Sequence, residues 1–489
     1  MMKLKLYNTL TKSLEDVKPN SEGVVTLYNC GPTVYSHQHI GNYRAYANWD
    51  ILHRALLYLG YRVHRIMNIT DVGHLTSDED FGEDKMEKGG RKLGTNDPYV
   101  VAEYYTKSFL SDMYRLNMLA PSGKAMDGDI DLAQLKEWGW IRATASIEPM
   151  IELIKMMEEK GFVYETKQAV YFDVSKYEEY TKLSGQRLED KLVGVRDDVN
   201  VDQEKRHPAD FVLWMKRYGE YSDHAMHWNS PWGDGFPGWH IECSAMGIEY
   251  LGGYISVHTG GIEHIPVHHT NERAQNFGAL NKEVVELWVH NEHLQSKGGE
   301  KLAKSLGNAY TINELVDLGF DPMDIRWLLI SVNYKIPLQF SLEALEGAKN
   351  SRLSLTSKLK NKMSIGSIQQ GEVLEDFDNR FKMALADNLN MSEAFAVLIE
   401  VVKSREAVND IFATVESFDK VLGLNLIPAV LKKEEKEDLP QAVVEVLDLR
   451  AKARESGNYA ESDRLRDEIK NLGYIVKDTS NGQEVERIK

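Results

Sequence analysis

One stretch of the chain, residues 24–69, constrains the fold more than any other. It opens with VVTLYNC (24–30), which is rich in β-branched residues and ends at the turn signal Gly31-Pro32. After the tetrapeptide HIGN (39–42), apolar residues at 51, 52, 55, 56 and 59 recur at helical spacing, and Gly60 ends the predicted helix. A second strand pattern follows over 61–69. This order predicts a parallel α/β unit, in which ligands bind beyond the carboxyl ends of the strands.

The rest of the chain divides into segments of different character. Residues 76–100 are polar and rich in glycine, which predicts a long exposed loop. A mixed region over about 136–225 contains a helical stretch around 149–160, strand-like patterns recur over 239–290, and the pattern is helical from about 340 onward. The last predicted helix has Leu465, Ile469 and Leu472 on one face and Gly473 as its C-cap, and Asn481-Gly482 predicts a terminal hairpin.

Composition narrows the class of protein. Hydrophobic residues make up 42% of the chain and charged residues 27%, as in ordinary globular proteins. Two cysteines in 489 residues exclude a disulfide framework and indicate a reducing, cytoplasmic location. The first twenty residues lack the apolar core of an export signal, and no apolar run approaches the length of a membrane helix. We therefore expect a cytoplasmic protein without a membrane partner.

Charge bears on nucleic-acid binding. The net charge of −17 argues against a protein that coats nucleic acid non-specifically. Residues 347–371, however, contain no acid and five bases: Lys349, Arg352, Lys358, Lys360 and Lys362. This run is as compatible with a solvated helix face as with contacts to phosphates.

Two motifs suggest phosphate chemistry. The HIGN tetrapeptide places His39, Gly41 and Asn42 at the start of the predicted helix, where unpaired backbone N–H groups and the helix dipole favour an anion such as a triphosphate. An ordinary polar turn is the alternative. In GGEKLAKSLGN (298–308), Lys301 and Lys304 lie on a glycine-rich segment, where ammonium groups can neutralise a phosphate leaving group. Solvated lysines on a loop are the alternative there.

A third set of residues suggests a metal site. The segments FPGWHIECSAM (236–246) and VHHTNERAQ (267–275) contain the second cysteine, and His268 and Glu272 are four residues apart, on one face of a helical turn. Together with Cys30, whose other interpretation is a buried filler thiol, they offer zinc two thiolates, an imidazole and a carboxylate. His269 is the rival ligand, although an ideal helix turns it about 100° away from His268.

Taken in order, NCGPTVY, FPGWHIECSAM, HHTNE and EKLAKSLGN resemble the cysteinyl-tRNA synthetases, a family of class I aminoacyl-tRNA synthetases, and ESGNYAESDRLRDEIKNLGY resembles that family's closing helices. The resemblance covers nearly the whole chain. It implies an α/β fold with a Rossmann-like parallel-sheet catalytic domain, an inserted connective domain, a C-terminal helical bundle and a small α+β end domain. The implied boundaries are 1–135 and 226–297 for the catalytic halves, 136–225 for the insertion, 298–340 for a stem-contact region with the KLAKS loop, 341–430 for the tRNA-binding bundle and 431–489 for an anticodon-binding domain.

The resemblance also implies a function: ATP-dependent ligation of L-cysteine to tRNA(Cys) through cysteinyl-adenylate, by a monomer that holds one Zn²⁺ per chain and uses Mg²⁺ with ATP. The zinc would select the substrate thiolate. The implied zinc ligands are Cys30, Cys243, His268 and Glu272, and the implied phosphate-binding residues are His39, Gly41, Asn42, Lys301 and Lys304. Gly260, Gly261 and Glu263 would lie near the ribose, and Thr70, Trp239 and His258 would line the amino-acid pocket.

Two departures from the family pattern affect the expected rate. Asn42 stands where the class I signature usually has histidine, and Leu302 and Ala303 replace the usual Met and Ser of the lysine loop. An amide donates a hydrogen bond to phosphate but carries no charge. Two other functions remain open: a related enzyme that joins activated cysteine to an amino sugar, and a non-catalytic tRNA-binding paralog. The long helical region after 340 counts against the first, and both lysines with a complete set of zinc donors count against the second.

Overall fold

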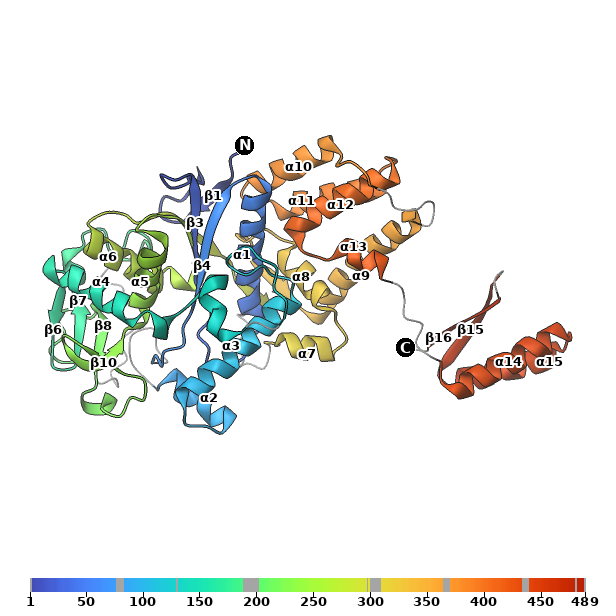
Figure 1. Ribbon diagram of the computed structural model, residues 1–489, viewed down its shortest axis with the longest axis horizontal. Helices are drawn as coiled ribbons and strands as arrows, with labels where there is room; N and C mark the ends of the chain where they lie inside the picture. Colours follow the sequence, from blue (N-terminus) through green and yellow to red (C-terminus); the bar gives the residue numbers. More distant parts are fainter. Residues whose placement is uncertain are drawn as a thin grey trace. The chain divides into compact units, whose positions relative to one another are not determined.

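A five-stranded parallel sheet forms the centre of the larger part of the chain. In the computed structural model its order is β12-β11-β3-β4-β5, with strands β3 (Val24–Asn29), β4 (Arg62–Ile69), β5 (Trp140–Arg142), β11 (Ile255–Gly261) and β12 (Val285–Asn291). All neighbouring strands are parallel. Helix α1 (Ile40–Tyr58) connects β3 to β4 and lies beside them (Figure 1). The predicted α/β unit is therefore confirmed.

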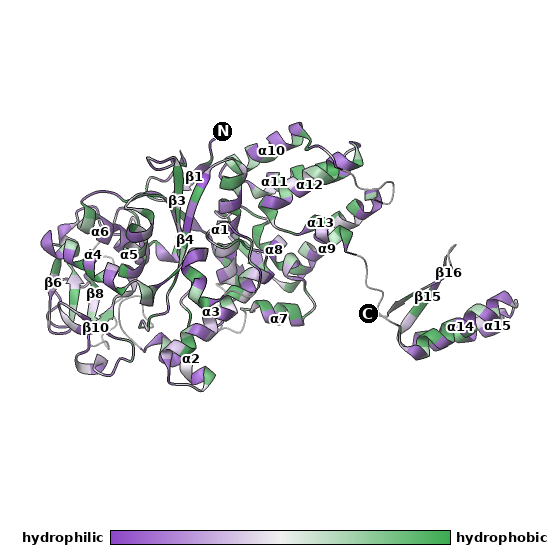
Figure 2. Ribbon diagram, in the orientation of Figure 1, coloured by the Kyte–Doolittle hydropathy of each residue, from purple (hydrophilic) through white to green (hydrophobic). Residues whose placement is uncertain are grey.

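The structure describes residues 2–75, 83–128, 131–187, 202–296, 298–299, 309–363, 370–432, 439–479 and 482–487. The chain forms two units, Met1–Val430 and Leu431–Lys489. No helix within the described ranges is long and apolar enough to span a bilayer. Figure 2 shows a hydrophobic β3, which suits a strand buried on both faces of a parallel sheet.

A second, antiparallel sheet lies in the chain between β5 and β11. Its order is β6-β7-β8-β10-β9, with strands β6 (Val163–Glu165), β7 (Ala169–Phe172), β8 (Phe211–Lys216), β9 (Trp228–Ser230) and β10 (Gly233–Pro237). Helices α4 (Ile147–Glu159), α5 (Trp239–Leu251) and α6 (His268–Leu280) pack together beside it (Figure 1). The helix expected around 149–160 is confirmed. Within 239–290, strands β11 and β12 confirm the strand-like pattern, but α5 and α6 are helices. In α5 a short, continuously buried and mostly apolar run has the same pattern in either element.

The exposed loop expected over 76–100 is also wrong for its described part. Helix α2 (Lys85–Leu93) begins after Asp84, whose carboxylate accepts from the backbone N–H of Met86 at 2.6 Å, and it is followed by α3 (Pro98–Arg115). The glycines that suggested a loop serve packing instead. A Cβ on Gly89 would lie 2.5 Å from the carbonyl oxygen of Tyr35, so glycine lets α2 lie directly against the loop between β3 and α1.

Helices dominate the chain after residue 309, as predicted from about 340. They are α7 (Ile312–Asp317), α8 (Pro322–Ile330), α9 (Leu342–Met363), α10 (Glu375–Ala386), α11 (Met391–Lys403), α12 (Val408–Leu422) and α13 (Leu426–Leu431). Two strand pairs complete this unit: β1 (Lys5–Asn8) with β2 (Ser13–Asp16), and β13 (Leu294–Ser296) with β14 (Leu338–Phe340).

The C-terminal unit consists of two helices and a hairpin. Helices α14 (Gln441–Glu455) and α15 (Tyr459–Asn471) precede the antiparallel strands β15 (Tyr474–Thr479) and β16 (Gly482–Arg487), so the hairpin is confirmed. Leu465 and Ile469 are buried as expected. Leu472, however, is 42% exposed, because α15 ends at Asn471 and the chain turns away at Gly473.

A buried ion network ties α1 to the helical region. The carboxylate of Asp50 on α1 accepts from Arg54 at 2.8 Å and from Arg326 on α8 at 2.6 Å. Arg326 also donates to the carbonyl oxygens of Leu422, the last residue of α12, and Leu116. Burial on its own would raise the pKa of Asp50, but the two guanidinium groups outweigh it and lower the pKa to about 2.

We expect Asp50→Asn to lower the free energy of unfolding of the larger unit by about 3–5 kcal/mol at pH 7, because it leaves buried guanidinium charges uncompensated. Since the folded pKa lies below the unfolded value, the stabilisation is present at neutral pH and is lost as the pH falls towards about 2. Urea unfolding followed by tryptophan fluorescence measures it, because all nine tryptophans lie in this unit. Glu400→Gln, which breaks an exposed pair with Arg380, should change little. An equal loss in both variants would contradict the network's role.

Candidate active site and metal centre

A cavity of ≈ 560 Å³ opens beyond the carboxyl ends of β3 and β11. Strands β3 and β11 are adjacent. From β3 the next strands in the chain, β4 and β5, extend the sheet to one side, and from β11 the next strand, β12, extends it to the other. Open α/β sheets bind ligands at such a switch point. The cavity is lined by the loop after β3, the start of α1, and residues that include Lys85, Trp239, Gly260, Gly261, Glu263, Asn291 and His293.

The HIGN segment forms the first turn of α1. His39 is the N-cap: its ring Nδ1 accepts from the backbone N–H of Gly41 at 3.1 Å, and the side-chain oxygen of Asn42 accepts from the backbone N–H of His39 at 3.1 Å. This reciprocal pair is a capping box. His39, Gly41 and Asn42 all line the cavity, at the positive end of the helix dipole.

Four predicted metal donors lie together. Cys30, Cys243, His268 and Glu272 each offer a ligand atom, and these atoms lie within 4.8 Å of one another. All four residues are buried. Cys30 follows β3 and its backbone N–H donates to the carbonyl oxygen of Thr259 in β11, whereas the other three lie on α5 and α6. The sheet therefore supplies one sulfur and the two helices supply the remaining donors.

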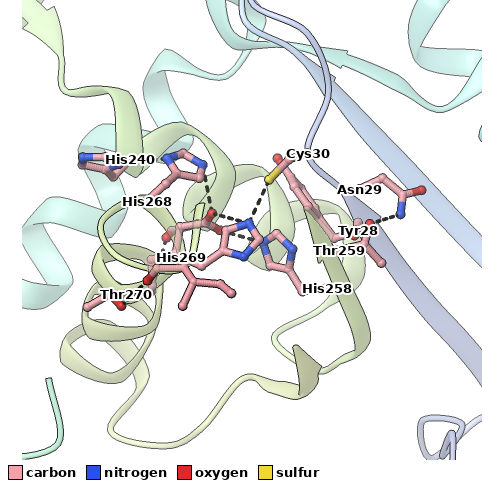
Figure 3. Close-up of polar contacts among 12 residues, drawn as sticks. Tyr28, Asn29, Cys30, His240, His258, Thr259, His268, His269 and Thr270 are labelled. Atoms are coloured by element: carbon pink, nitrogen blue, oxygen red, sulfur yellow. Dashed lines mark hydrogen bonds and ion pairs between the residues drawn. The ribbon is translucent and has the colours of Figure 1, made fainter. Parts of the chain in front are cut away.

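A second, overlapping set of donors contains Cys30, His258, His269 and Glu272. His269, expected to point away from His268, nevertheless places its Nε2 3.2 Å from the sulfur of Cys30, and Figure 3 shows this contact with His258 beside it. The ring is held there by a 2.8 Å hydrogen bond between its Nδ1 and Nε2 of His290 on β12. Cys30 and Glu272 are common to both sets.

Glu272 brings a negative charge into the buried cluster. Burial opposes ionisation of Glu272, but His258 and His268 outweigh it and lower the pKa of Glu272 to about 2. Burial raises the pKa of Cys30 well above its usual value. Glu272 Oε1 lies 3.0 Å from Nε2 of His268 in a geometry that is not a hydrogen bond, so this buried oxygen has no hydrogen-bond partner among the described residues. An unsatisfied buried carboxylate oxygen beside two sulfurs and an imidazole fits a bound metal ion.

Of the three residues expected in the amino-acid pocket, Trp239 and His258 contact members of this cluster, whereas Thr70 is not among the described residues that line the cavity. Trp239 lines the cavity, with its ring centroid 4.5 Å from that of His268. His258 is buried and its Nε2 lies 2.8 Å from Glu272 Oε2. Thr70 is buried at the end of β4, next to the turn after Cys30, and donates to Glu242 at 2.7 Å.

The residues expected near the ribose follow β11 into the cavity. Gly260, Gly261 and Glu263 all line it. A Cβ on Gly260 would lie 2.5 Å from the His264 ring and 2.6 Å from the His269 ring, so only glycine lets the histidine rings approach the strand. Lys301 and Lys304 lie outside the described residues.

Sequence reasoning missed three side chains at the site. They are Glu242, His74 and Lys85. Glu242 accepts a hydrogen bond from Thr70 and forms a buried ion pair with His74. Lys85 lines the cavity, and its ammonium group lies 4.6 Å from the centre of the Trp239 ring. The signal for Glu242 was a carboxylate within the apolar segment FPGWHIECSAM. Lys85 was not identified because residues 76–100 were predicted to form an exposed loop.

The parallel sheet with its interrupting antiparallel sheet, and the cavity at the end of β3, define a class I aminoacyl-tRNA synthetase fold. Residues 16–350 match the family model of the tRNA synthetases class I (C) catalytic domain. The Mycobacterium tuberculosis methionyl-tRNA synthetase bound by methionyl-adenylate has a similar structure, with a TM-score of 0.55 at 15% identity, covering 85% of this chain and 92% of that one. The Agrobacterium radiobacter LeuRS in a ternary complex with tRNA gives a TM-score of 0.56 at 13% identity, over 84% and 85%.

Relatives at higher identity define the family within this class. Residues 436–485 match the cysteinyl-tRNA ligase anticodon binding domain. The cysteine–tRNA ligase of Treponema denticola is 39% identical, over 98% of this chain and 98% of the relative. Cysteine–tRNA ligase 1 of Burkholderia lata is 38% identical, over 99% and 96%. The chain belongs to the cysteine–tRNA ligase family.

We expect Glu242→Gln to lower the free energy of unfolding of the larger unit by about 1–3 kcal/mol, because an amide cannot serve both Thr70 and His74 as the carboxylate does, and one buried polar group loses its partner. Glu249→Gln, at an exposed position on the same helix, is the matched control. Urea unfolding compares the two. Equal stability of both variants would show that the network contributes nothing.

Proposed function

We propose that this chain ligates L-cysteine to tRNA(Cys) through cysteinyl-adenylate, releasing pyrophosphate and then AMP. The observation that carries the proposal is that the only two cysteines of the chain meet His268 and Glu272 in a buried cluster beside the cavity. A cysteine that only filled space in the core would not need a histidine and a carboxylate beside it. The membership of the cysteine–tRNA ligase family supports the same reaction.

We assign the cluster to one Zn²⁺ per chain, held by Cys30, Cys243, His268 and Glu272. Two sulfurs, one nitrogen and one oxygen are a donor set that zinc accepts. When bound, zinc supplies a Lewis acid that prefers a thiolate to the hydroxyl of serine. His258 keeps Glu272 ionised and oriented through its 2.8 Å contact. Trp239 forms the wall beside His268 and restricts the size of the side chain that fits.

The first chemical step needs alignment rather than a protein nucleophile. An oxygen of the cysteine carboxylate attacks the α-phosphorus of ATP, the bond from that phosphorus to the bridging oxygen breaks, and pyrophosphate leaves. We assign His39, Gly41 and Asn42, at the start of α1, to the phosphates, and Gly260, Gly261 and Glu263 to the ribose. Lys301 and Lys304 are assigned to the departing pyrophosphate from the sequence alone. Mg²⁺ would accompany ATP.

The described basic residues of α9 refine the expected tRNA contacts. Arg352 is buried and pairs with Asp324 at 2.7 Å, and Lys349 lies over the ring of Phe320. These two are therefore engaged within the protein. Lys358 is exposed and, with Lys403 of α11, lines a groove of ≈ 380 Å³. We propose that this groove contacts tRNA phosphates.

The remaining assignments follow the family. We propose the catalytic halves at 1–135 and 226–297, the connective insertion at 136–225, the stem-contact region at 298–340, the tRNA-binding bundle at 341–430 and the anticodon-binding domain at 431–489. A cytoplasmic monomer is proposed on the same basis. Cysteine-dependent ATP–pyrophosphate exchange tests the activation step and would be absent from a non-catalytic paralog. Charging of tRNA(Cys) would be absent from an enzyme that transfers cysteine to an amino sugar.

Substitution of metal donors decides between the two overlapping sets. Cys243→Ser and His268→Ala should each lose the bound zinc and lower cysteine-dependent exchange by at least roughly 100-fold, because a ligand matters more than the groups that orient it. His269→Ala, the matched neighbour, should keep one zinc per chain. Elemental mass spectrometry of the purified proteins measures the metal. Loss of zinc from His269→Ala together with its retention in His268→Ala would transfer the ligand role to His269.

Charge reversal in the groove tests the tRNA contact. Lys358→Glu combined with Lys403→Glu should weaken tRNA binding by about 10-fold at low salt and reduce its salt dependence, because two phosphate contacts are replaced by repulsion. ATP–pyrophosphate exchange should remain unchanged. Lys420→Glu on α12, an exposed lysine that is not among the described residues of the groove, is the control. Filter binding across a salt series measures the affinity for tRNA. Equal weakening by Lys420→Glu would show that the groove does not contact tRNA specifically.

A further inference from the structure

Both cysteines of the chain lie in one buried cluster, and they differ in their access to the active-site cavity. The sulfur atoms of Cys30 and Cys243 belong to the donor set whose ligand atoms lie within 4.8 Å of one another, and both thiols are free. Cys30 is 7% exposed and lines the cavity, whereas Cys243 is 2% exposed and is not among the described lining residues. A small solute in the cavity therefore meets the sulfur of Cys30 first.

The backbone brings the two sulfurs together from separate elements. Cys30 follows β3, and its N–H donates to the carbonyl oxygen of Thr259 in β11 at 3.1 Å. Cys243 lies in the interior of α5. A disulfide joins two sulfurs that are about 2.05 Å apart, so the pair would have to close by less than about 3 Å. Rotation about a side-chain torsion moves a sulfur while the backbone stays in place.

Two neighbouring thiols of this kind can undergo a balanced two-electron oxidation by a peroxide. The Cys30 thiolate attacks one oxygen of hydrogen peroxide, the O–O bond breaks, and a sulfenic acid forms as hydroxide leaves. The Cys243 thiolate then attacks that sulfur, the S–O bond breaks, and the disulfide forms as a second hydroxide leaves. Peroxide is reduced and the two sulfurs are oxidised. A second thiol beside the first also prevents further oxidation to the irreversible sulfinic acid.

The disulfide and a bound zinc ion exclude each other. Zinc binds cysteine as the thiolate, and a sulfur that has formed a disulfide is no longer a thiolate. One bond between Cys30 and Cys243 would therefore remove two of the four proposed ligands at once. His268 and Glu272 would remain, which is fewer than the three protein ligands that catalytic zinc sites use.

We propose that the cluster is a reversible redox switch, in which peroxide joins Cys30 to Cys243, zinc leaves, and cysteine activation stops until a thiol reductant reopens the bond. This inference rests on the proposed zinc assignment and adds a modification of the same residues. It suits the reducing compartment proposed for the chain, where the disulfides that do form are mostly transient and redox-sensing.

Thiol counting measures the switch directly, because the chain has only these two cysteines. The zinc-loaded full chain would be treated with hydrogen peroxide and then analysed with a chromogenic thiol reagent under denaturing conditions, by elemental mass spectrometry and by peptide mass mapping. Mapping separates the cysteines from oxidation at the 17 methionines. We expect both thiols and the zinc to be lost together and one peptide pair to be cross-linked. Dithiothreitol followed by zinc should restore the thiols, the metal and ATP–pyrophosphate exchange.

The two single-cysteine variants are matched controls for the order of the steps. Cys243→Ser keeps the sulfur that lines the cavity but removes its partner, so Cys30 should proceed to sulfinic acid, which dithiothreitol does not reverse. Cys30→Ser keeps only the sulfur away from the described lining, so Cys243 should oxidise more slowly. Equal rates in the two variants would contradict the cavity as the path of the oxidant.

The wild-type chain alone can also overturn the proposal. Sulfinic acid at Cys30 with an intact Cys243 thiol would exclude the disulfide, and a cross-link between two chains would place the bond elsewhere. Retention of both thiols at peroxide concentrations that oxidise free L-cysteine would exclude the switch altogether. Failure of the untreated chain to bind zinc would refute the zinc assignment instead, and the thiol count of the same sample would still decide whether the bond forms.

Discussion

The buried carboxylate of Glu272 is the constraint on which the site depends. A carboxylate with no exposed surface is stable in ionised form only if positive partners surround it. His258 from β11 and His268 from its own helix lower the pKa of Glu272 to about 2, and a Zn²⁺ ion held by a neutral His268 would itself be the positive partner. Cys30 must come to the same place from β3, which the parallel pairing of β3 with β11 ensures. The pairing of β3 with β11 therefore determines which donors can meet. A metal ion would satisfy Glu272 Oε1, the oxygen that has no hydrogen-bond partner among the described residues.

Buried charged groups also connect the cavity to the helical region. Helix α1 begins at the cavity with the HIGN turn and carries Asp50 inward, where Arg326 of α8 binds it. Arg44, two residues beyond the HIGN segment, donates to the backbone carbonyl oxygens of Val332, Asn333 and Ile336. Because these charges are buried, α1 cannot shift relative to α8 without exposing or unpairing them. The helix that begins with the proposed phosphate-binding turn is thus joined through buried charges to α8, in the helical region proposed to contact tRNA.

Much of this arrangement could be predicted from local sequence signals, and the exceptions have physical causes. The strand, helix and strand over 24–69 could be predicted from periodicity. The cluster could be predicted because its side chains are all types that bind zinc: Cys30, Cys243, His268 and Glu272. Helices α2 and α5 were missed for opposite reasons. Glycines in α2 that permit close packing look like loop residues, and the buried run of α5 has no polar face to reveal its period. The approach of His269 to Cys30 depends on His290 in a distant strand, which no local pattern contains.

The substitution of Asn42 for the usual histidine changes how the cavity attracts anions. Its side-chain oxygen closes the capping box with His39, so the residue fixes the first turn of α1, but the amide adds no charge. The described wall of the cavity also contains the acids Glu263 and Glu292. At this turn, the backbone N–H groups and the dipole at the start of α1 are therefore what favours an anion. The opposite wall is fixed by packing rather than by charge: a Cβ on Gly89 would lie 2.5 Å from the carbonyl oxygen of Tyr35, so glycine at this position lets α2 close against the loop after β3.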